Sequence, residues 1–255
     1  MGIEKAVFVH TGMGPDNRGY LTHMQELLEV QKKYPNKVIA FATIDEADPH
    51  AAEILEKAIG DGARGLKLIG GHPNFYDEPL DSPNMYKVYQ VVRKHQLPVL
   101  IHASLSKHPK QRQELERILR DFPDLTIVAA HYAKTAPKLE KAQELLDRYP
   151  NLFTDISMGG GLSRYQKEIC LEPKKFRDFI IRNQDRILWG TDIILTSGKK
   201  EEFLRRRISI DFNIFEMDFY VDDQLALNHV LTGLTLPKEI LEKIYYTNPK
   251  RILRL

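Results

Sequence analysis

Three apolar segments of this sequence each end at or next to a side chain that can bind a proton or a metal ion. The segments are LPVLIHA (97–103), LTIVAAH (125–131) and RILWGTD (186–192). Apolar, partly β-branched runs without polar alternation are typical of strands buried on both faces, as in a parallel sheet covered by helices. A parallel barrel builds its site at the carboxyl ends of its strands. We therefore predict that His102, His131 and Asp192 share one site.

Apolar runs alternate with amphipathic stretches along most of the chain, at a spacing of roughly thirty residues, which is typical of strand–helix–strand units. The predicted strands cover residues 5–10, 38–44, 63–69, 97–103, 125–131, 152–156 and 186–192. A doubly wound sheet has the same rhythm, but the segment HTGMGP (10–15) does not fit its G-x-G-x-x-G phosphate turn. Polar residues at many strand ends favour the barrel instead.

The predicted fold is α/β, a single (β/α)₈ TIM-barrel-like domain that spans residues 1–255. Residues 199–255 are expected to form a helical cap, with helices near 223–231 and 237–245. A closed barrel needs eight strands, whereas the pattern contains seven. Either the tail supplies an eighth strand or the natural chain begins upstream of Met1. We expect the first β/α unit of the barrel to be missing.

Charge and cysteine content argue against several classes of function. The 37 Lys and Arg residues balance 35 Asp and Glu residues without long blocks, so nothing favours a nucleic acid or a membrane as partner. The single cysteine, Cys170, rules out an internal disulfide and fits a reducing compartment. Without an apolar stretch of about 18 residues or a signal peptide, the protein is expected in the cytoplasm. The expected partner is a small-molecule substrate, and a homo-oligomer stays open as an alternative.

A set of motifs resembles the amidohydrolase superfamily, and within it the amidohydrolase-related branch that includes aminocarboxymuconate-semialdehyde decarboxylase. The motifs are GIEKAV at Gly2, GARGLKL at Gly62, LPVLIHA at Leu97, FPDLTIVAAH at Phe122, YPNLFTDIS at Tyr149, RILWGTD at Arg186 and TNPKRIL at Thr247. They span almost the whole chain, and their order and spacing carry the resemblance. It implies that GIEKAV lies on the second strand of the barrel.

The resemblance implies that His102 is a metal ligand and that His131 is a second ligand or a proton shuttle. It also implies that Asp192 binds the metal and takes a proton from water. In that family the first barrel strand carries a His-x-His or Glu-x-His pair, which has no counterpart in this sequence. His10 is a lone histidine, and it lies on the strand that matches the second barrel strand. The implied cofactor is a divalent ion, with Zn²⁺ as first choice, which keeps an open position for water. Such an ion lowers the pKa of bound water to roughly 7.

His10, Lys67 and His72 are the predicted substrate-binding residues. Lys67 has three readings: a carboxylated lysine that bridges two metals, as in binuclear amidohydrolases, a buried ion pair, or a Schiff-base lysine. His10, Asp45 and Asp155 end strands and are expected to line or support the mouth of the barrel, with capping and loop hydrogen bonds as the alternative. His72 lies in a long loop that could close over substrate.

Three functions fit these residues. The leading prediction is a metal-dependent hydrolase that attacks a small amide, ester or lactone with a metal-activated water. A metal-dependent non-oxidative decarboxylase of an aromatic or unsaturated carboxylic acid would use the same residues. The third reading is an inactive, truncated protein with the amidohydrolase fold, because two of the implied ligands are missing.

Overall fold

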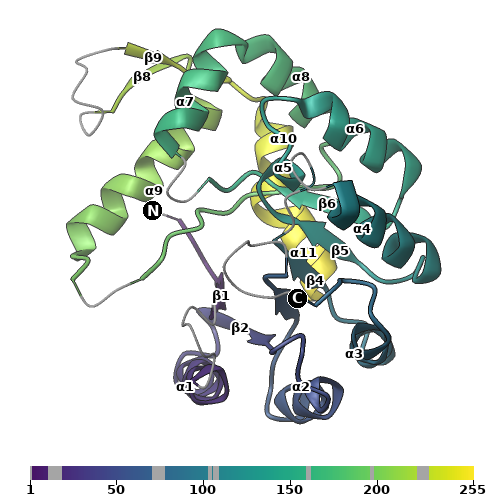
Figure 1. Cartoon of the computed structure of the whole chain (residues 1–255). Helices are drawn as coiled ribbons and strands as arrows, with labels where there is room; N and C mark the ends of the chain where they lie inside the picture. Colours follow the sequence, from purple (N-terminus) through teal and green to yellow (C-terminus); the bar gives the residue numbers. More distant parts are fainter. Residues whose placement is uncertain are drawn as a thin grey trace.

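Seven parallel strands in sequence order form a curled, half-barrel sheet at the centre of the protein (Figure 1). The strands are β1 (Ala6–Val9), β2 (Val38–Thr43), β3 (Leu66–Leu68), β4 (Val99–Ile101), β5 (Ile127–Ala129), β6 (Leu152–Asp155) and β7 (Ile187–Leu188). The computed structural model describes residues 2–10, 19–70, 78–102, 105, 109–158, 162–195, 198–222 and 230–255. Within these ranges β1 and β7 are the two edges of the sheet. The predicted α/β, TIM-barrel-like fold is confirmed.

Helices alternate with the strands and cover the outer face of the sheet (Figure 1). Those between the strands are α1 (Tyr20–Lys33), α2 (Ala51–Gly60), α3 (Pro83–Lys94), α4 (Pro109–Asp121), α6 (Leu139–Arg148), α7 (Leu162–Leu171) and α8 (Pro173–Arg182). The short element α5 (Ala130–Ala133) directly follows β5 and contains left-handed backbone. After β7 come α9 (Glu201–Glu216), α10 (Lys238–Glu242), the π-helix η3 (Lys243–Thr247) and α11 (Asn248–Leu253). None of the described helices has the length and apolar character needed to cross a lipid bilayer.

Helix α3 illustrates how local sequence sets the bounds of these elements. Ser82 lies just before the helix, and its Oγ accepts a hydrogen bond from the Met85 N–H at 3.2 Å. Pro83 occupies the first helical position, where the missing N–H leaves no hydrogen bond unmade. The buried side chains of α3 recur at helical spacing and are Met85, Val88, Tyr89 and Val92. The helix thus presents one apolar face to the sheet.

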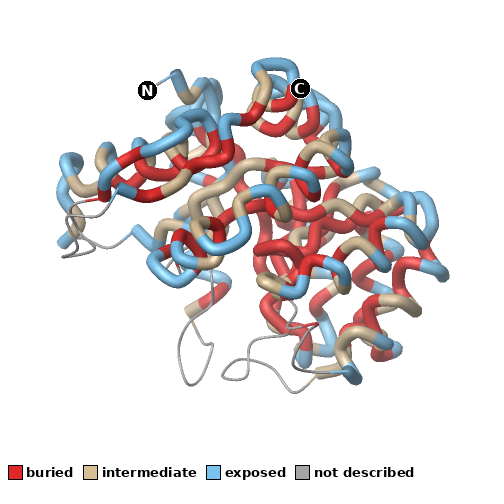
Figure 2. The backbone as a smooth tube through the Cα atoms, turned by 90° about the horizontal axis from the view of Figure 1, so that it is seen from above, coloured by how far each residue is buried: buried red, intermediate tan, exposed pale blue. Residues whose placement is uncertain are grey.

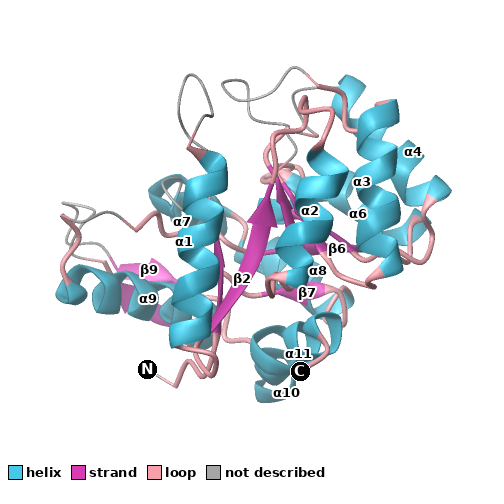
Figure 3. Cartoon of the chain, turned by 90° about the horizontal axis from the view of Figure 1, so that it is seen from below, coloured by secondary structure: helices cyan, strands magenta, loops and turns pink. Residues whose placement is uncertain are grey.

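Alternate residues of each strand face two different cores. Ala42, Leu66 and Ile101 face outward and are buried in the main core with the apolar sides of the helices. Figure 2 shows that the buried segments of the chain gather in the interior of the molecule. Phe41 faces the inside of the curled sheet and forms a smaller cluster with Leu253 of α11. In Figure 3 the strand arrows point away from α10 and α11. These helices therefore lie at the amino-terminal end of the sheet. They do not cover the carboxyl ends of the strands, where a site can form.

The tail departs from the predicted helical cap. Its helices α9, α10 and α11 are present, but two short strands, β8 (Phe219–Val221) and β9 (Val230–Thr232), form an antiparallel hairpin. The prediction of a helix near 223–231 is wrong for Val230 and Leu231, and residues 223–229 lie outside the described residues. The prediction that the tail could supply an eighth strand is also wrong for the described part of the chain. β8 and β9 pair with each other, where each satisfies the other's backbone groups, and not with the seven-stranded sheet.

Candidate active site

The three predicted residues His102, His131 and Asp192 come together at the carboxyl ends of the strands. The rings of His102 and His131 lie edge to face, with 5.2 Å between centroids and 71° between planes. On its other side, His131 Nε2 lies 3.7 Å from Asp192 Oδ2. His131 therefore stands between the other two. Its side chain is 5% exposed, whereas that of Asp192 is 47% exposed, so a substrate that enters from solvent can reach the carboxylate.

The backbone becomes left-handed directly after β5. His131, Tyr132, Ala133 and Lys134 have φ values of 61°, 53°, 53° and 53°, which is one turn of left-handed helix without a glycine. Each such residue costs roughly 1–2 kcal/mol, because Cβ approaches the following carbonyl oxygen. Strain of this kind persists where neighbouring contacts hold the backbone in place. The turn sets where the His131 side chain enters the site.

Strand β6 provides the contacts that hold this turn. Asp155 Oδ1 accepts three hydrogen bonds, from His131 N–H at 3.0 Å, Ser157 N–H at 3.0 Å and Ser157 Oγ at 2.6 Å. Thr154 Oγ1 accepts from Ala133 N–H at 3.1 Å and donates to Ala129 O at 2.6 Å. All six residues are buried. Side chains of β6 thus hold the strained segment that follows the neighbouring strand β5.

The His131 ring is anchored through its Nδ1 atom. Nδ1 lies 2.9 Å from the Ser157 carbonyl oxygen and 2.9 Å from Ser157 Oγ, while Asp155 Oδ1 is 3.8 Å away. Burial lowers the pKa of His131 below its ordinary value, and the charge of Asp155 opposes this in part. The ring is therefore fixed at one end and presents Nε2 to Asp192.

Lys67 lies on β3 and faces the inside of the curled sheet, in register with Thr43 of β2 and Leu100 of β4. It is buried, with 7% of the residue exposed. Burial lowers its pKa, and the charges of Asp155 and Asp192 oppose that shift. The predicted substrate-binding lysine therefore shares the electrostatic environment of His131 and the two carboxylates.

The other predicted substrate-binding residues lie elsewhere or outside the described residues. His10 follows β1, and its ring stacks on that of His23 in α1, with 4.2 Å between centroids. Burial, and then the neighbouring His23, lowers the pKa of His10. It stands at the edge of the sheet away from β4 and β5. His72 falls in the segment 71–77, which is outside the described residues.

Sequence reasoning missed Glu46, which directly follows Asp45 at the end of β2. Glu46 is fully buried, and its Oε1 accepts hydrogen bonds from Ile69 N–H at 3.0 Å and Gly70 N–H at 2.9 Å. Burial raises its pKa to about 7. Asp45 forms a local hydrogen bond, in which its Oδ1 accepts from Ala47 N–H, as the alternative reading expected. Strand alternation could have pointed to Glu46. Successive residues of an extended strand face opposite sides, so Glu46 is expected on the side opposite to Asp45.

Ser157 was also missed, although it lies within the quoted motif YPNLFTDIS. The spacing Asp-x-Ser lets a carboxylate at a strand end accept from a hydroxyl two residues later. That hydroxyl is what joins Asp155 to the His131 ring.

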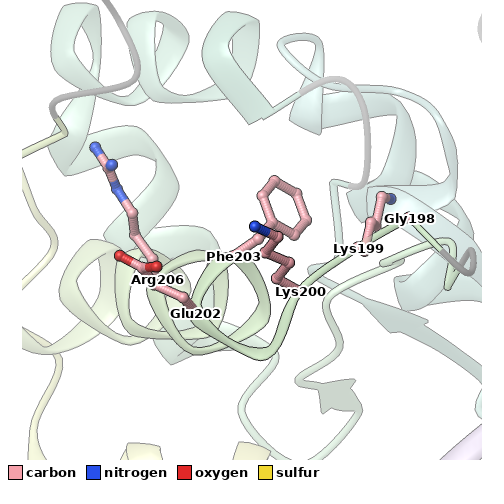
Figure 4. A pocket seen from close by; sticks show the side chains of 6 residues that line it. All are labelled: Gly198, Lys199, Lys200, Glu202, Phe203 and Arg206. Atoms are coloured by element: carbon pink, nitrogen blue, oxygen red, sulfur yellow. The ribbon is translucent and has the colours of Figure 1, made fainter.

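A separate surface hollow of about 340 Å³ lies at the start of α9 (Figure 4). Its described lining residues are Gly198, Lys199, Lys200, Glu202, Phe203 and Arg206. Lys199 Nζ lies over the Phe203 ring, 5.3 Å from its centroid. The predicted site residues come from β3, β4, β5 and the segment after β7. None of the predicted site residues is among the described residues that line this hollow.

Imidazole and carboxylate are the right donors for a divalent ion such as Zn²⁺. Two ligands of one tetrahedral ion, each at roughly 2.1 Å, lie roughly 3.4 Å apart. The 3.7 Å between His131 Nε2 and Asp192 Oδ2 is close to this value, and His102 is the adjacent donor. Among the described residues, however, no group of three His, Cys, Asp or Glu side chains is arranged to hold a metal. The donor chemistry fits a metal, and the described residues supply it in part.

Comparison with known proteins identifies the family. The amidohydrolase family profile matches residues 5–255, which is nearly the whole chain. The chain belongs to the amidohydrolase family. This confirms the resemblance drawn from the sequence motifs, and enzymes of this superfamily generally use a divalent metal ion. None of the curated proteins compared with the chain matches it.

Several solved structures share the amidohydrolase fold of this chain. An uncharacterised TIM-barrel protein from Bordetella bronchiseptica has 20% identity and a TM-score of 0.64, over 99% of this chain and 78% of that chain. A 2,6-dihydroxybenzoate decarboxylase from Rhizobium has 16% identity and a TM-score of 0.62, over 99% and 84%. A probable 2-pyrone-4,6-dicarboxylic acid hydrolase from Acinetobacter baumannii has 15% identity and a TM-score of 0.62, over 99% and 84%. At these identities the likeness shows the fold alone.

Proposed function

We propose that this amidohydrolase is a metal-dependent hydrolase that acts on a small amide, ester or lactone. The observation that supports the proposal is the convergence of His102, His131 and Asp192 at the carboxyl ends of β4, β5 and β7. Hydrolysis needs an activated water, a group that takes its proton and a group that protonates or polarises the substrate. The three side chains can fill these roles because they lie together at the carboxyl ends of the strands.

The proposed ligands are His102, His131 and Asp192, with Zn²⁺ as the first choice of ion. When bound, such an ion supplies Lewis acidity and lowers the pKa of water. Asp192 is the proposed proton acceptor, because its carboxylate is half exposed and faces His131 Nε2. If its Nε2 does not bind the ion, His131 is instead the second proposed group for proton transfer, since its ring is held in one orientation by Ser157. Lys67 is proposed to hold a negatively charged part of the substrate, because it is buried among these groups.

Metal analysis of the purified chain and kinetics of Asp192→Asn test the proposal. We expect a bound divalent ion and a loss of turnover of about 100-fold or more on a panel of small lactones, esters and amides. Asp178→Asn is a matched control, because Asp178 lies on the exposed side of α8, where Lys174 contacts it. Absence of bound metal together with unchanged turnover of Asp192→Asn would refute the hydrolase.

A non-oxidative decarboxylase is the second candidate. The observation that favours it is the fold shared with the 2,6-dihydroxybenzoate decarboxylase, combined with a buried lysine beside the site that could pair with a carboxylate. Release of carbon dioxide from a panel of aromatic and unsaturated carboxylic acids separates the two reactions. If the metal-loaded chain neither hydrolyses the first panel nor decarboxylates the second, neither proposed reaction is supported and the hypothesis of an inactive protein is favoured.

A further inference from the structure

The partners of His131 Nδ1 determine which ring nitrogen bears the proton. The Ser157 carbonyl oxygen, 2.9 Å away, can only accept a hydrogen bond. The Ser157 hydroxyl, also 2.9 Å away, has one hydrogen, which it donates to Asp155 Oδ1 at 2.6 Å. Both partners of Nδ1 are therefore acceptors. Nδ1 must be the donor.

The other ring nitrogen then has a lone pair. A neutral imidazole holds one proton, so Nε2 is an acceptor when Nδ1 is protonated. Nε2 faces Asp192 Oδ2 at 3.7 Å, which is also an acceptor. Two acceptors that face each other favour a proton or a cation between them. This is the arrangement that a base or a metal ligand requires of His131.

One carboxylate oxygen also fixes the backbone beneath this ring. Asp155 Oδ1 accepts from the His131 N–H as well as from Ser157, so the same atom holds the start of the left-handed turn and, through Ser157, the ring that projects from it. Thr154 holds the turn through Ala133 N–H and Ala129 O, which are backbone groups. Asp155 is thus coupled to both the position and the protonated atom of His131.

We infer that Asp155 and Ser157 are positioning residues that lock His131 in the Nδ1–H tautomer, with the Nε2 lone pair directed at Asp192. The kinetic consequence of this inference rests on the function proposed above, whereas the tautomer itself does not. Residues that orient a ligand or base in this way typically contribute about 10- to 100-fold to metal affinity or activity.

The tautomer can be measured directly by nitrogen NMR on the full chain labelled with ¹⁵N-histidine, at a pH where the ring is neutral. Signals of His131 are assigned by their loss in His131→Gln. We expect wild type to show the Nδ1–H tautomer. Asp155→Ala removes the acceptor, and we expect a mixture of tautomers. Asp155→Asn keeps an amide oxygen that can accept the same three hydrogen bonds, so the Nδ1–H form should persist.

Thr154→Val is the matched control, because it removes hydrogen bonds to the same turn without touching the ring. It should lower stability and keep the Nδ1–H tautomer. On a substrate of the wild-type enzyme, Asp155→Ala should lose about 10- to 100-fold in kcat with KM little changed, and Asp155→Asn should lose less.

Two results overturn the inference: an Nε2–H tautomer in wild type, or a tautomer in Asp155→Ala that is unchanged from wild type. The first depends only on wild type and on the His131→Gln variant used for assignment, so a poorly folded Asp155→Ala leaves the inference open to refutation. Because the NMR measurement needs no turnover, its outcome is separate from that of the proposed function. An Nδ1–H ring in a chain without any activity would support the tautomer and contradict the hydrolase.

Discussion

Glu46 should make the stability of this protein fall as the pH rises through neutrality. Its side chain is fully buried, and burial raises its pKa from 4.5 to about 7, although hydrogen bonds from Ile69 and Gly70 oppose this. In the unfolded chain the pKa returns to its ordinary value. Between the two values the folded protein holds a proton that the unfolded chain has lost, so the free energy of unfolding decreases with rising pH. From pH 5 to pH 8 the decrease is about 2.5 kcal/mol.

Substitution of Glu46 by glutamine removes this titration. The amide oxygen of glutamine can still accept from the Ile69 and Gly70 N–H groups, so the geometry is kept. Urea unfolding of wild type and Glu46→Gln between about pH 5 and pH 8 gives the two stability curves. The variant should gain about 2.5 kcal/mol relative to wild type across this range. Glu53→Gln, at a site on α2 whose side chain is 80% exposed, should follow wild type. Parallel curves for wild type and Glu46→Gln would refute the reasoning, because the buried carboxyl would then be ionised at both ends of the range.

Two further substitutions test how neighbouring parts of the fold are held. In Gly70→Ala the added methyl group would overlap the Glu46 carboxyl group, so we expect a loss of about 1–3 kcal/mol in urea unfolding. A double-mutant cycle with Glu46→Ala should show coupling, and additive losses would contradict the contact. Ser82→Ala leaves the Met85 N–H without its acceptor and should cost about 1 kcal/mol. The exposed Ser209→Ala on α9 is its control, and an equal effect of the two would exclude the cap as the cause.

The strands and the proximity of His102 to His131 could be predicted because their signals are local. An apolar run such as 38–44 is stable as a strand buried on both faces of a covered parallel sheet. The structure places β2 at Val38–Thr43. The polar residues that follow β4 and β5 then meet because neighbouring parallel strands pair in register, with Leu100 opposite Val128. The convergence of His102 and His131 follows from these two facts.

The turn after β5 could not be predicted from its residues. Positions 131–134 read His-Tyr-Ala-Lys, and left-handed backbone is normally signalled by glycine or asparagine. The turn exists because Thr154 and Asp155 of another strand hold it, and that information is not local. The β8–β9 hairpin was missed for a related reason, since Val230 and Leu231 were predicted to be part of a helix, whereas their partners Val221 and Tyr220 lie nine and eleven residues upstream.

The location of the site relative to the sheet edges separates the predicted residues into two groups. His102, His131 and Asp192 follow β4, β5 and β7, Asp155 ends β6, and the parallel ladder from β4 to β7 is continuous. Their relative positions therefore depend on pairings that the structure contains. His10 follows β1, which is the opposite edge of the seven-stranded sheet, and its ring packs on α1. Closure of the sheet between β1 and β7 would change the surroundings of His10, while the positions of His102 and His131 are set by strands that already pair. The proposed role of His10 in substrate binding thus depends on whether the sheet closes beside β1. The proposed chemistry at His131 does not depend on this closure.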